Sequence, residues 1–304
     1  MSDVFPIGCA WVNNCFVDIS EAKIPILDWG FLRSDATYDV VHVWENRFFL
    51  LDKHLDRFYK STEKLRMPCS FSRKKIKKIL SGCVVRSGLK NAYVEIIQTR
   101  GMSPAFNRDP RQAKPRLMAF SVPFAWILKQ ENFEEGLNIS VTSKKRISSE
   151  SVDPTIKNYH WLDFVGGMFE AYDGGADTGV LIDDKNNVLE GPGFNIFSLI
   201  DGFLYTPKNG VLEGITRSAV IAIANCINIP VVFESLSVDS FLMSSEIFAT
   251  STAGGIMPIT KVNNLKIGSG KAGVFTKKIN KIYWKKHKDP VWSCLVENFY
   301  DKDF

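Results

Sequence analysis

The stretch VLEGITRSAVIAIA, residues 211–224, is the part of the sequence that decides the fold most directly. Gly214 marks a turn, and the apolar residues that follow it recur at helical spacing, so the segment predicts a turn leading into a helix over about 216–227. The first amides of a helix have no partner inside the helix and point outward. They would suit a phosphate group, although a plain capped helix explains this motif equally well when it is taken alone.

Four other short motifs surround this one in a fixed order. They are DPTIKNYHW (153–161), LEGPGFNIF (189–197), LYTP (204–207) and STAGGIMPI (251–259). The Gly-x-Gly after Glu190 is typical of a turn before a strand at 194–199. The small residues of 251–255 follow another predicted strand and would let the backbone approach an anion closely. Each motif is weak alone, and the order makes the set specific.

Periodicity divides the remaining chain into strands and helices of modest length. Alternating segments predict strands in the first third, Asp52 is a candidate N-cap for a helix that ends before Pro68, and apolar spacing predicts a second helix over about 72–85. A loop at 101–115 shows no periodicity and is rich in Pro, Arg and Asn, as functional loops often are. The strands expected in the first part are 8–17, 37–43, 92–99 and 117–122, and the second part adds strands at 137–142, 179–182, 194–199, 230–234 and 246–250, with helices at 163–172 and 216–227. This mixture indicates an α+β protein, with too few helices for a (β/α)8 barrel.

The composition excludes several classes of protein. A chain of 304 residues with 45% hydrophobic residues can bury a substantial core in two domains. No segment is apolar for the roughly 20 residues that a membrane span needs. Six cysteines without a CxxC pair, and an N-terminus without a secretory pattern, favour reduced thiols and a cytoplasmic location.

The runs of Lys and Arg are more typical of the solvent-exposed faces of helices and loops than of a nucleic-acid-binding site. The net charge is +5, and much of it lies in runs at 74–78, 144–146 and 277–288. In the first run the lysines alternate with apolar residues as on an amphipathic helix. The four histidines show no metal-ligand spacing, so no metal is expected; they are His42, His54, His160 and His287.

Taken in order, the five motifs resemble those of the fold-type IV pyridoxal phosphate enzymes, the family of branched-chain and D-amino-acid aminotransferases. The resemblance covers nearly the whole chain. It implies a small N-terminal α/β domain (1–122) that forms the substrate pocket wall, a linker (123–130) and a larger cofactor domain (131–304) with a β-barrel-like core. It also implies pyridoxal 5'-phosphate as cofactor and a homodimer.

The same resemblance assigns roles to the motif residues. Lys157 would form the Schiff base with the cofactor and move protons, and Glu190 would hold the pyridine nitrogen protonated. Leu212 would pack on the ring face. The expected phosphate ligands are the amides of Ile215 and Thr216, the Thr216 hydroxyl, Ser251, Thr252 and Arg57. Without the family position, Lys157 would be an ordinary surface lysine and Arg57 a surface arginine.

The substrate side of the resemblance points to R-selective amine transaminases. The segment Tyr93-Val94-Glu95 is more similar to that of these enzymes than to the Tyr-x-Arg of branched-chain enzymes. Unless Glu95 faces solvent, its negative charge would repel a substrate carboxylate, which a branched-chain enzyme must bind. Segment 26–49, with Tyr38 shaping the small pocket, is also similar, but Arg33 departs from the pattern. Arg108, with Arg111 as the alternative, is the candidate for a mobile carboxylate-binding residue, and Trp161 and Ala253 are expected at the pocket wall.

The predicted reaction is ping-pong transfer of an amino group from an R-configured primary amine to a 2-keto acid such as pyruvate. The alternatives are a D-amino-acid or branched-chain aminotransferase and, third, an aminodeoxychorismate lyase. A non-catalytic binding protein on the same fold is argued against by the intact Lys157, Glu190 and Thr252.

Overall fold

The computed structural model describes residues 4–304 and divides them into two compact units. The first unit comprises the described residues up to Ala125 together with Ile156–Tyr159 and His287–Phe304, and the second comprises Trp126–Thr155 and His160–Lys286. Two short segments from the range assigned by sequence to the second domain therefore belong to the first unit, and one of them carries Lys157. No helix among the described residues is long and apolar enough to span a membrane.

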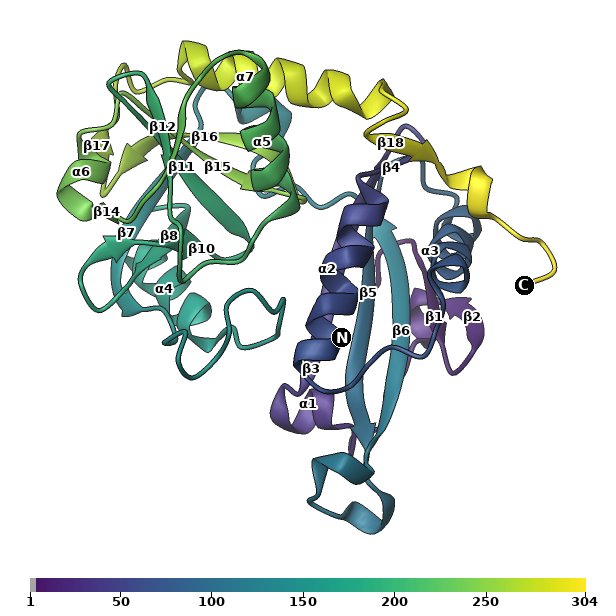
Figure 1. The fold of residues 1–304 in the computed structure, drawn as a ribbon. Coiled ribbons are helices and arrows are strands. Elements are labelled where there is room, and N and C mark those ends of the chain that lie inside the picture. The colour runs from purple at the N-terminus through teal and green to yellow at the C-terminus, as the bar shows by residue number, and fades with distance from the viewer. Residues whose placement is uncertain (1–3) are drawn as a thin grey trace. The chain divides into compact units, whose positions relative to one another are not determined.

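The first unit is built on one antiparallel sheet (Figure 1). Its order is β18-β4-β3-β5-β6-β1-β2. The strands are β1 (Cys9–Val12), β2 (Cys15–Asp18), β3 (Ala36–Trp44), β4 (Arg47–Phe49), β5 (Ala92–Met102), β6 (Lys114–Pro123) and β18 (Ser293–Leu295). The long central strands pair in register, with Tyr38 opposite Ile97 and Val40 opposite Glu95.

Two helices cover one face of this sheet. They are α2 (Leu51–Lys64) and α3 (Arg73–Ser87), whereas the short α1 (Trp29–Arg33) precedes β3. Phe58 of α2 and Ile79 of α3 share a core with Val94 of β5, and all three are fully buried. Each such side chain contributes roughly 1.5–3 kcal/mol through its burial. Because side chains alternate along a strand, the residues between those of the core, such as Tyr93 and Glu95, lie on the opposite face.

The second unit contains an 11-stranded mixed sheet. Nine strands follow the order β13-β12-β11-β15-β16-β7-β8-β9-β14, and β10 pairs with β11 while β17 pairs with β16. The strands are β7 (Leu137–Lys145), β8 (Thr178–Ile182), β9 (Asn187–Val188), β10 (Glu190–Gly191), β11 (Phe194–Ile200), β12 (Phe203–Thr206), β13 (Val231–Phe233), β14 (Leu236–Ser237), β15 (Glu246–Ser251), β16 (Gly255–Val262) and β17 (Leu265–Lys266). One core of side chains from β7, β8, β11, β15 and β16 fills the inside of this sheet.

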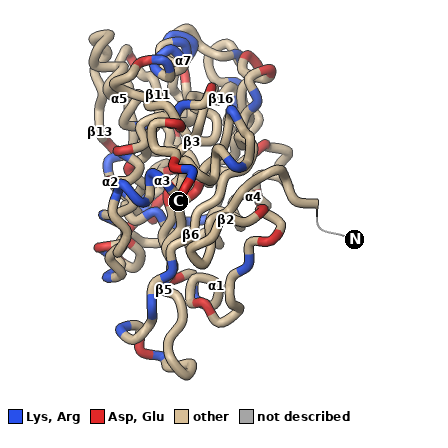
Figure 2. The backbone as a smooth tube through the Cα atoms, turned by 90° about the vertical axis from the view of Figure 1, so that its right-hand side faces the viewer, with Lys and Arg blue, Asp and Glu red and all other residues tan. Residues whose placement is uncertain are grey.

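Four helices complete the second unit. They are α4 (Leu162–Asp173), α5 (Ile215–Cys226), α6 (Val238–Leu242) and α7 (Val274–Lys285). Helix α4 packs on β7 and β8, and α5 and α7 pack on each other and on β15 and β16. Basic residues are frequent along α7 (Figure 2), and most lysines of 277–288 are exposed, whereas Ile279 and Tyr283 of the same helix are buried.

The expected α+β class is confirmed, and two local predictions need correction. The first strand is a hairpin, because Asn13 and Asn14 adopt φ of 51° and 64° and turn the chain between β1 and β2. Asp52 is not the N-cap of α2, since the helix begins at Leu51 and Leu50 occupies the cap position without a side-chain hydrogen bond. Asp52 lies in the first turn and pairs with Lys77 at 2.6 Å.

Candidate active site

Lys157 lies in a short extended segment that pairs with β3. Its carbonyl oxygen accepts hydrogen bonds from the Tyr38 amide at 3.1 Å and from the Thr37 hydroxyl at 2.7 Å, and Asn158 forms an antiparallel bridge with Thr37. The Lys157 Nζ lies 4.3 Å from the centre of the Tyr38 ring. No carboxylate among residues 4–304 forms an ion pair with this nitrogen. The backbone of Lys157 is thus fixed while its amine is not held in a salt bridge.

Three tyrosines and Glu95 lie on the same face as this amine. The Tyr159 hydroxyl donates to Glu95 Oε1 at 2.6 Å, and the Tyr93 hydroxyl donates to Oε2 at 3.2 Å. The Tyr38 and Tyr159 rings stack with their centres 4.3 Å apart. Glu95 is only 7% exposed, so it does not face solvent. Burial raises the pKa of Glu95, against the hydrogen bond from Tyr159 and the charge of Lys157, which lower it.

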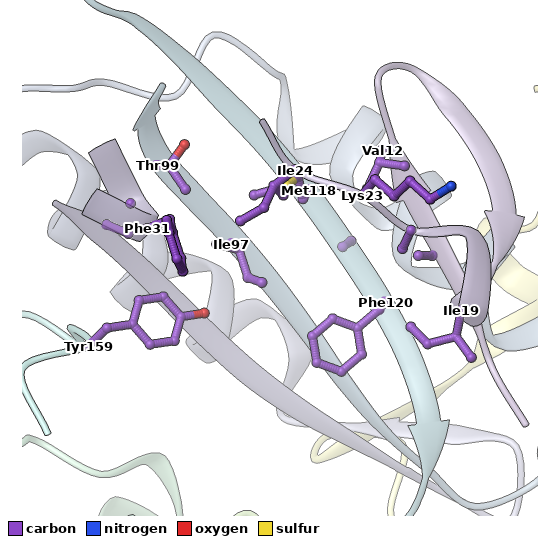
Figure 3. Close-up of a pocket in the computed structure, with 15 residues that line it drawn as sticks. Val12, Ile19, Lys23, Ile24, Phe31, Ile97, Thr99, Met118, Phe120 and Tyr159 are labelled. Atoms are coloured by element: carbon purple, nitrogen blue, oxygen red, sulfur yellow. The ribbon is translucent and has the colours of Figure 1, made fainter. Parts of the chain in front are cut away.

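An apolar pocket of about 440 Å³ continues along this face of the first unit (Figure 3). Ile97 of β5 and Phe120 of β6 form its floor, Phe31 of α1 lies at one side, and Tyr159 borders it. The side chains that line it are almost entirely aliphatic or aromatic, with Lys23 as its one charged residue among those described. The pocket therefore suits an apolar occupant.

Arg57 lies on the helix-covered face, where it binds Asp39. Its Nε and Nη2 donate to the two carboxylate oxygens at 2.7 and 2.9 Å, and His54 Nδ1 lies 2.7 Å from Asp39 Oδ1. Burial raises the pKa of Asp39, but the charge of Arg57 and the hydrogen bond to His54 outweigh it and hold the pKa well below its usual range. The sequence predicts a phosphate contact for Arg57, and the contact that the structure displays is this buried carboxylate.

Glu190 in the second unit is a buried carboxylate surrounded by donors. Its Oε2 accepts from the Leu212 amide at 3.0 Å and from Asn195 Nδ2 at 3.3 Å, and its Oε1 lies 3.3 Å from Arg146 Nε. Asp163 binds the same arginine at 2.6 Å. Because Asn195 also donates to the Leu212 carbonyl, the carboxylate and the loop before α5 form one bonded network.

The start of α5 fits an anion. Its N-cap, Gly214, provides no side-chain hydrogen bond, so the amides of the first turn are not capped by a side chain. A Cβ at Gly214 would lie 2.1 Å from Asn195 Oδ1, so the close approach requires glycine. Thr216 follows in the first turn and is 5% exposed.

The turn after β15 adds hydroxyl and amide groups in the same unit. The Ser251 hydroxyl donates to the Gly193 carbonyl at 2.8 Å and accepts from the Ala253 amide at 3.1 Å. Thr252 between them is partly exposed. Uncapped amides and hydroxyls can donate to a phosphate, and a buried carboxylate can accept from a protonated pyridine nitrogen, so these residues fit the expected cofactor.

The remaining predicted substrate residues make other contacts, and Trp161 also lies near Gly193, where a Cβ would be 3.7 Å from its ring. Arg33 is exposed and stacks on the Trp29 ring at 3.8 Å, and Arg108 is exposed in the loop between β5 and β6. Arg111, in the same loop, makes a two-pronged ion pair with Asp109. Trp161 precedes α4 and packs against Phe164.

Comparison with known proteins identifies the family. The model of "Amino-transferase class IV" matches residues 36–262. The chain belongs to the class IV aminotransferases. A putative branched-chain-amino-acid aminotransferase of Methanocaldococcus jannaschii is 30% identical over 272 residues, covering 88% of this chain and 93% of that protein. A D-alanine aminotransferase of Staphylococcus haemolyticus is 24% identical over 281 residues, covering 88% and 94%.

Solved structures of this family have the same fold as this class IV aminotransferase. A branched-chain amino acid aminotransferase crystallised with pyridoxamine 5'-phosphate has a TM-score of 0.90 at 26% identity, covering 97% of this chain and 100% of that one. That of Thermoproteus uzoniensis with norvaline has a TM-score of 0.87 at 26% identity, covering 95% and 99%. The expected fold type and its pyridoxal phosphate chemistry are confirmed. The comparisons support the branched-chain and D-amino-acid alternative better than the R-amine prediction.

Sequence reasoning missed the partners of the predicted residues in this aminotransferase. Tyr159 was not singled out, although its position two residues after Lys157 in an extended segment places both side chains on one side. Asn195 and Arg146 were also missed; Asn195 lies opposite Glu190 across the hairpin of β10 and β11, whereas no local pattern reveals that Arg146 lies beside Glu190.

Proposed function

We propose that this protein transfers the amino group of an amino acid with an apolar side chain to a 2-keto acid, with pyridoxal phosphate as cofactor. The observation that carries the proposal is the position of Lys157, whose backbone is fixed to β3 and whose amine lies on the Tyr38 ring without a carboxylate partner. An amine in such a site can attack a carbonyl group.

The cofactor-binding residues follow from the family and from the donor set of each unit. Lys157 would carry the cofactor, and Glu190 would accept a charge-assisted hydrogen bond from its ring nitrogen. The phosphate would be bound by the amides of Ile215 and Thr216 and by the hydroxyls of Thr216, Ser251 and Thr252, while Leu212 would contact the ring. When bound, pyridoxal phosphate supplies an electron-withdrawing ring conjugated to the substrate nitrogen.

The residues of the chain position this chemistry and move the proton. We assign proton transfer to Lys157 Nζ, which is basic, carried on a flexible stem and not held in a salt bridge. Leu212 and Asn195 hold Glu190 by its Oε2, so the carboxylate has a defined orientation before any ligand binds. Arg57 is paired with Asp39, so the positive charge that it would offer to the phosphate would be shared with this carboxylate.

The substrate proposal rests on the relatives and on the first unit. The relatives are named branched-chain and D-alanine aminotransferases. The face around Lys157 carries Tyr38, Tyr93 and Tyr159, and the adjoining pocket is apolar. An aliphatic side chain would be desolvated favourably against such walls.

A second candidate, an R-configured primary amine, is favoured by Glu95. This carboxylate is buried where a substrate carboxylate would need a cation, and burying two like charges side by side is costly. Arg108 or Arg111 would then serve the 2-keto acid alone, and the exposed Arg33 would affect the charge preference of the entrance. Trp161 and Ala253 would complete the pocket wall.

One panel of reactions separates the candidates. The purified protein is incubated with pyridoxal phosphate and offered L-leucine, D-alanine or (R)-1-phenylethylamine, each with 2-oxoglutarate or pyruvate. Turnover of L-leucine or D-alanine supports the first candidate, and turnover of the amine alone replaces it with the second. Product from aminodeoxychorismate without a keto acid would indicate a lyase, and a protein that binds no cofactor would refute both aminotransferase candidates.

We also propose that the chain works as a cytoplasmic homodimer. All six cysteines are unpaired in the structure, as expected in a reducing compartment. Exposed apolar side chains of the first unit include Ile24 and Phe31, which line the pocket, and Leu27 and Leu32, which are close to them in sequence. Exposed apolar residues beside a pocket are typical of an interface between subunits.

A further inference from the structure

The segment Ile156–Tyr159 is part of the first unit, although the residues on both sides of it belong to the second. Its backbone is attached to β3, since the Lys157 carbonyl oxygen accepts from the Tyr38 amide at 3.1 Å. Tyr159 adds an attachment to the neighbouring strand, because its hydroxyl donates to Glu95 Oε1 of β5 at 2.6 Å. The segment that carries Lys157 is therefore joined to two strands of the sheet.

The ring of Tyr159 lies beside the surface on which the Lys157 amine rests. It stacks on the Tyr38 ring, with the ring centres 4.3 Å apart and the planes inclined by 15°. Lys157 Nζ lies 4.3 Å from the centre of the same Tyr38 ring. A displacement of the Tyr159 side chain would therefore disturb the ring that the amine contacts.

Glu95 is a buried acceptor for the Tyr159 hydroxyl. This carboxylate is 7% exposed, and its other oxygen accepts from the Tyr93 hydroxyl at 3.2 Å. Burial and the charge of Glu95 raise the pKa of Tyr159, so the phenol keeps its proton and remains a donor. When Glu95 is ionised, the hydrogen bond is charge-assisted and roughly twice as strong as one between neutral groups. Its loss would free the Tyr159 side chain from β5 and leave the backbone pairing with β3 in place.

We propose that Tyr159 is a positioning residue for Lys157: its hydroxyl, bound to Glu95, and its ring, stacked on Tyr38, fix the place from which the lysine amine reacts. This inference rests on the proposed function, since it takes Lys157 as the residue to which pyridoxal phosphate attaches. The lysine amine is carried on a flexible stem, so fixing its neighbours raises the fraction of molecules in which it can attack. Glu95 thereby acts on the lysine through Tyr159 as well as on the charge of a substrate.

The test separates binding of the cofactor from its attachment to Lys157. Cofactor-depleted protein is mixed rapidly with increasing concentrations of pyridoxal phosphate, and the visible absorbance of the attached cofactor is followed in time. The limiting rate measures attachment, and the half-saturating concentration measures the binding step before it. Tyr159→Phe keeps the ring and removes the hydroxyl. We expect the limiting rate to fall about three- to tenfold, as for the loss of one hydrogen bond, at an unchanged half-saturating concentration.

Tyr59→Phe is the matched control in the same unit. The Tyr59 hydroxyl donates to the Phe71 carbonyl at 2.5 Å, so this substitution also removes one hydrogen bond of a phenol. Both kinetic constants should stay as in the unaltered protein, even where the melting temperature falls. An unchanged limiting rate in Tyr159→Phe, or an equal fall in Tyr59→Phe, would overturn the inference.

A double-mutant cycle shows whether Tyr159 acts through Glu95. Glu95→Ala removes the acceptor, so Tyr159→Phe should not lower the limiting rate further in that background. Glu95→Gln keeps an oxygen that can accept, and there the effect of Tyr159→Phe should persist. The same fold-change with and without the acceptor would overturn the inference, whereas an unaltered protein that develops no visible absorbance would refute the proposed function instead. Should Glu95→Ala fail to fold, Tyr159→Phe and Tyr59→Phe still decide the inference by the limiting rate.

Discussion

The Tyr159 hydroxyl donates a hydrogen bond of 2.6 Å to Glu95 Oε1, across 64 positions of sequence. Tyr93 donates to the other oxygen of the same carboxylate. The two phenols and the buried carboxylate form a polar cluster in an otherwise apolar face. Tyr159, one of the phenols, follows Lys157 by two residues in the sequence. Because burial raises the pKa of Glu95, its protonation should respond to pH and to the charge of a nearby ligand.

Stability should depend on pH through Glu95. Its pKa in the folded protein is raised above the ordinary 4.5, so the folded state holds this proton in a range where the unfolded state has lost it. The contribution of Glu95 to stability is fully present below about 4.5 and declines as the pH rises through the folded pKa. We expect Glu95→Gln to remove this decline, as measured by urea unfolding from pH 4 to pH 8.

The control for this experiment is Glu21→Gln, because Glu21 is exposed in the same unit. Its unfolding free energy should follow the unaltered protein at every pH. If Glu95→Gln and the unaltered protein show parallel curves, Glu95 does not have the raised pKa assigned to it.

Replacing Lys157 tests the site itself. Lys157→Ala should abolish the visible absorbance of the cofactor complex and reduce turnover at least about a thousandfold, because no other amine in the segment can take over proton transfer. Lys144→Ala, at an exposed lysine of β7, is the control and should keep both properties. A Lys157→Ala protein that retains the absorbance would place the attachment on a different lysine.

Asp39 should be important for the stability of the first unit. It is 1% exposed and neutralises Arg57 while it binds His54. Removing one partner of a buried pair costs about 3–5 kcal/mol, so Asp39→Ala should lower the free energy of unfolding by an amount in this range. Asp109→Asn breaks the exposed pair with Arg111 and should change it little. Equal losses of unfolding free energy in the two variants would contradict the conclusion that Asp39 belongs to a buried ion pair.

Glu190 should affect turnover more than cofactor retention. Glu190→Gln keeps the size of the side chain and can still accept from the Leu212 amide, but it loses the negative charge near the ring nitrogen. We expect kcat to fall about 10²- to 10³-fold, as for the loss of one electrostatic contact, with cofactor still bound by absorbance. Unchanged kcat would remove Glu190 from the proposed active site.

The proposed dimer can be tested at Phe31, which is 63% exposed beside the apolar pocket. A charge buried in an apolar interface is strongly unfavourable, so Phe31→Glu should shift the mass measured by light scattering from dimer to monomer. Leu265→Glu in β17, also at a 63% exposed position, is the matched control and should leave the mass unchanged. A dimer that persists in Phe31→Glu would exclude this face.

Local sequence patterns were sufficient to predict most of the helices and strands. Helical spacing predicted the helix over 72–85, and the structure gives α3 over Arg73–Ser87 with Ser72 as N-cap. It failed at Asp52, because this residue lies two positions past the N-cap, Leu50, and forms an ion pair with Lys77 instead. The helix α7 was not predicted, since its lysine-rich sequence suggested only an exposed face and its buried side is formed by few residues.

The sequence by itself determined the family and predicted the key residues, because the order of five motifs is a property of the chain that needs no coordinates. Tertiary structure alone decided which residues meet. It put Tyr159 on Glu95, gave Arg57 a carboxylate partner in Asp39, and placed Asn195 opposite Glu190 across β10 and β11. The first of these contacts joins residues 64 positions apart, and strand register and packing, rather than any local pattern, bring them together.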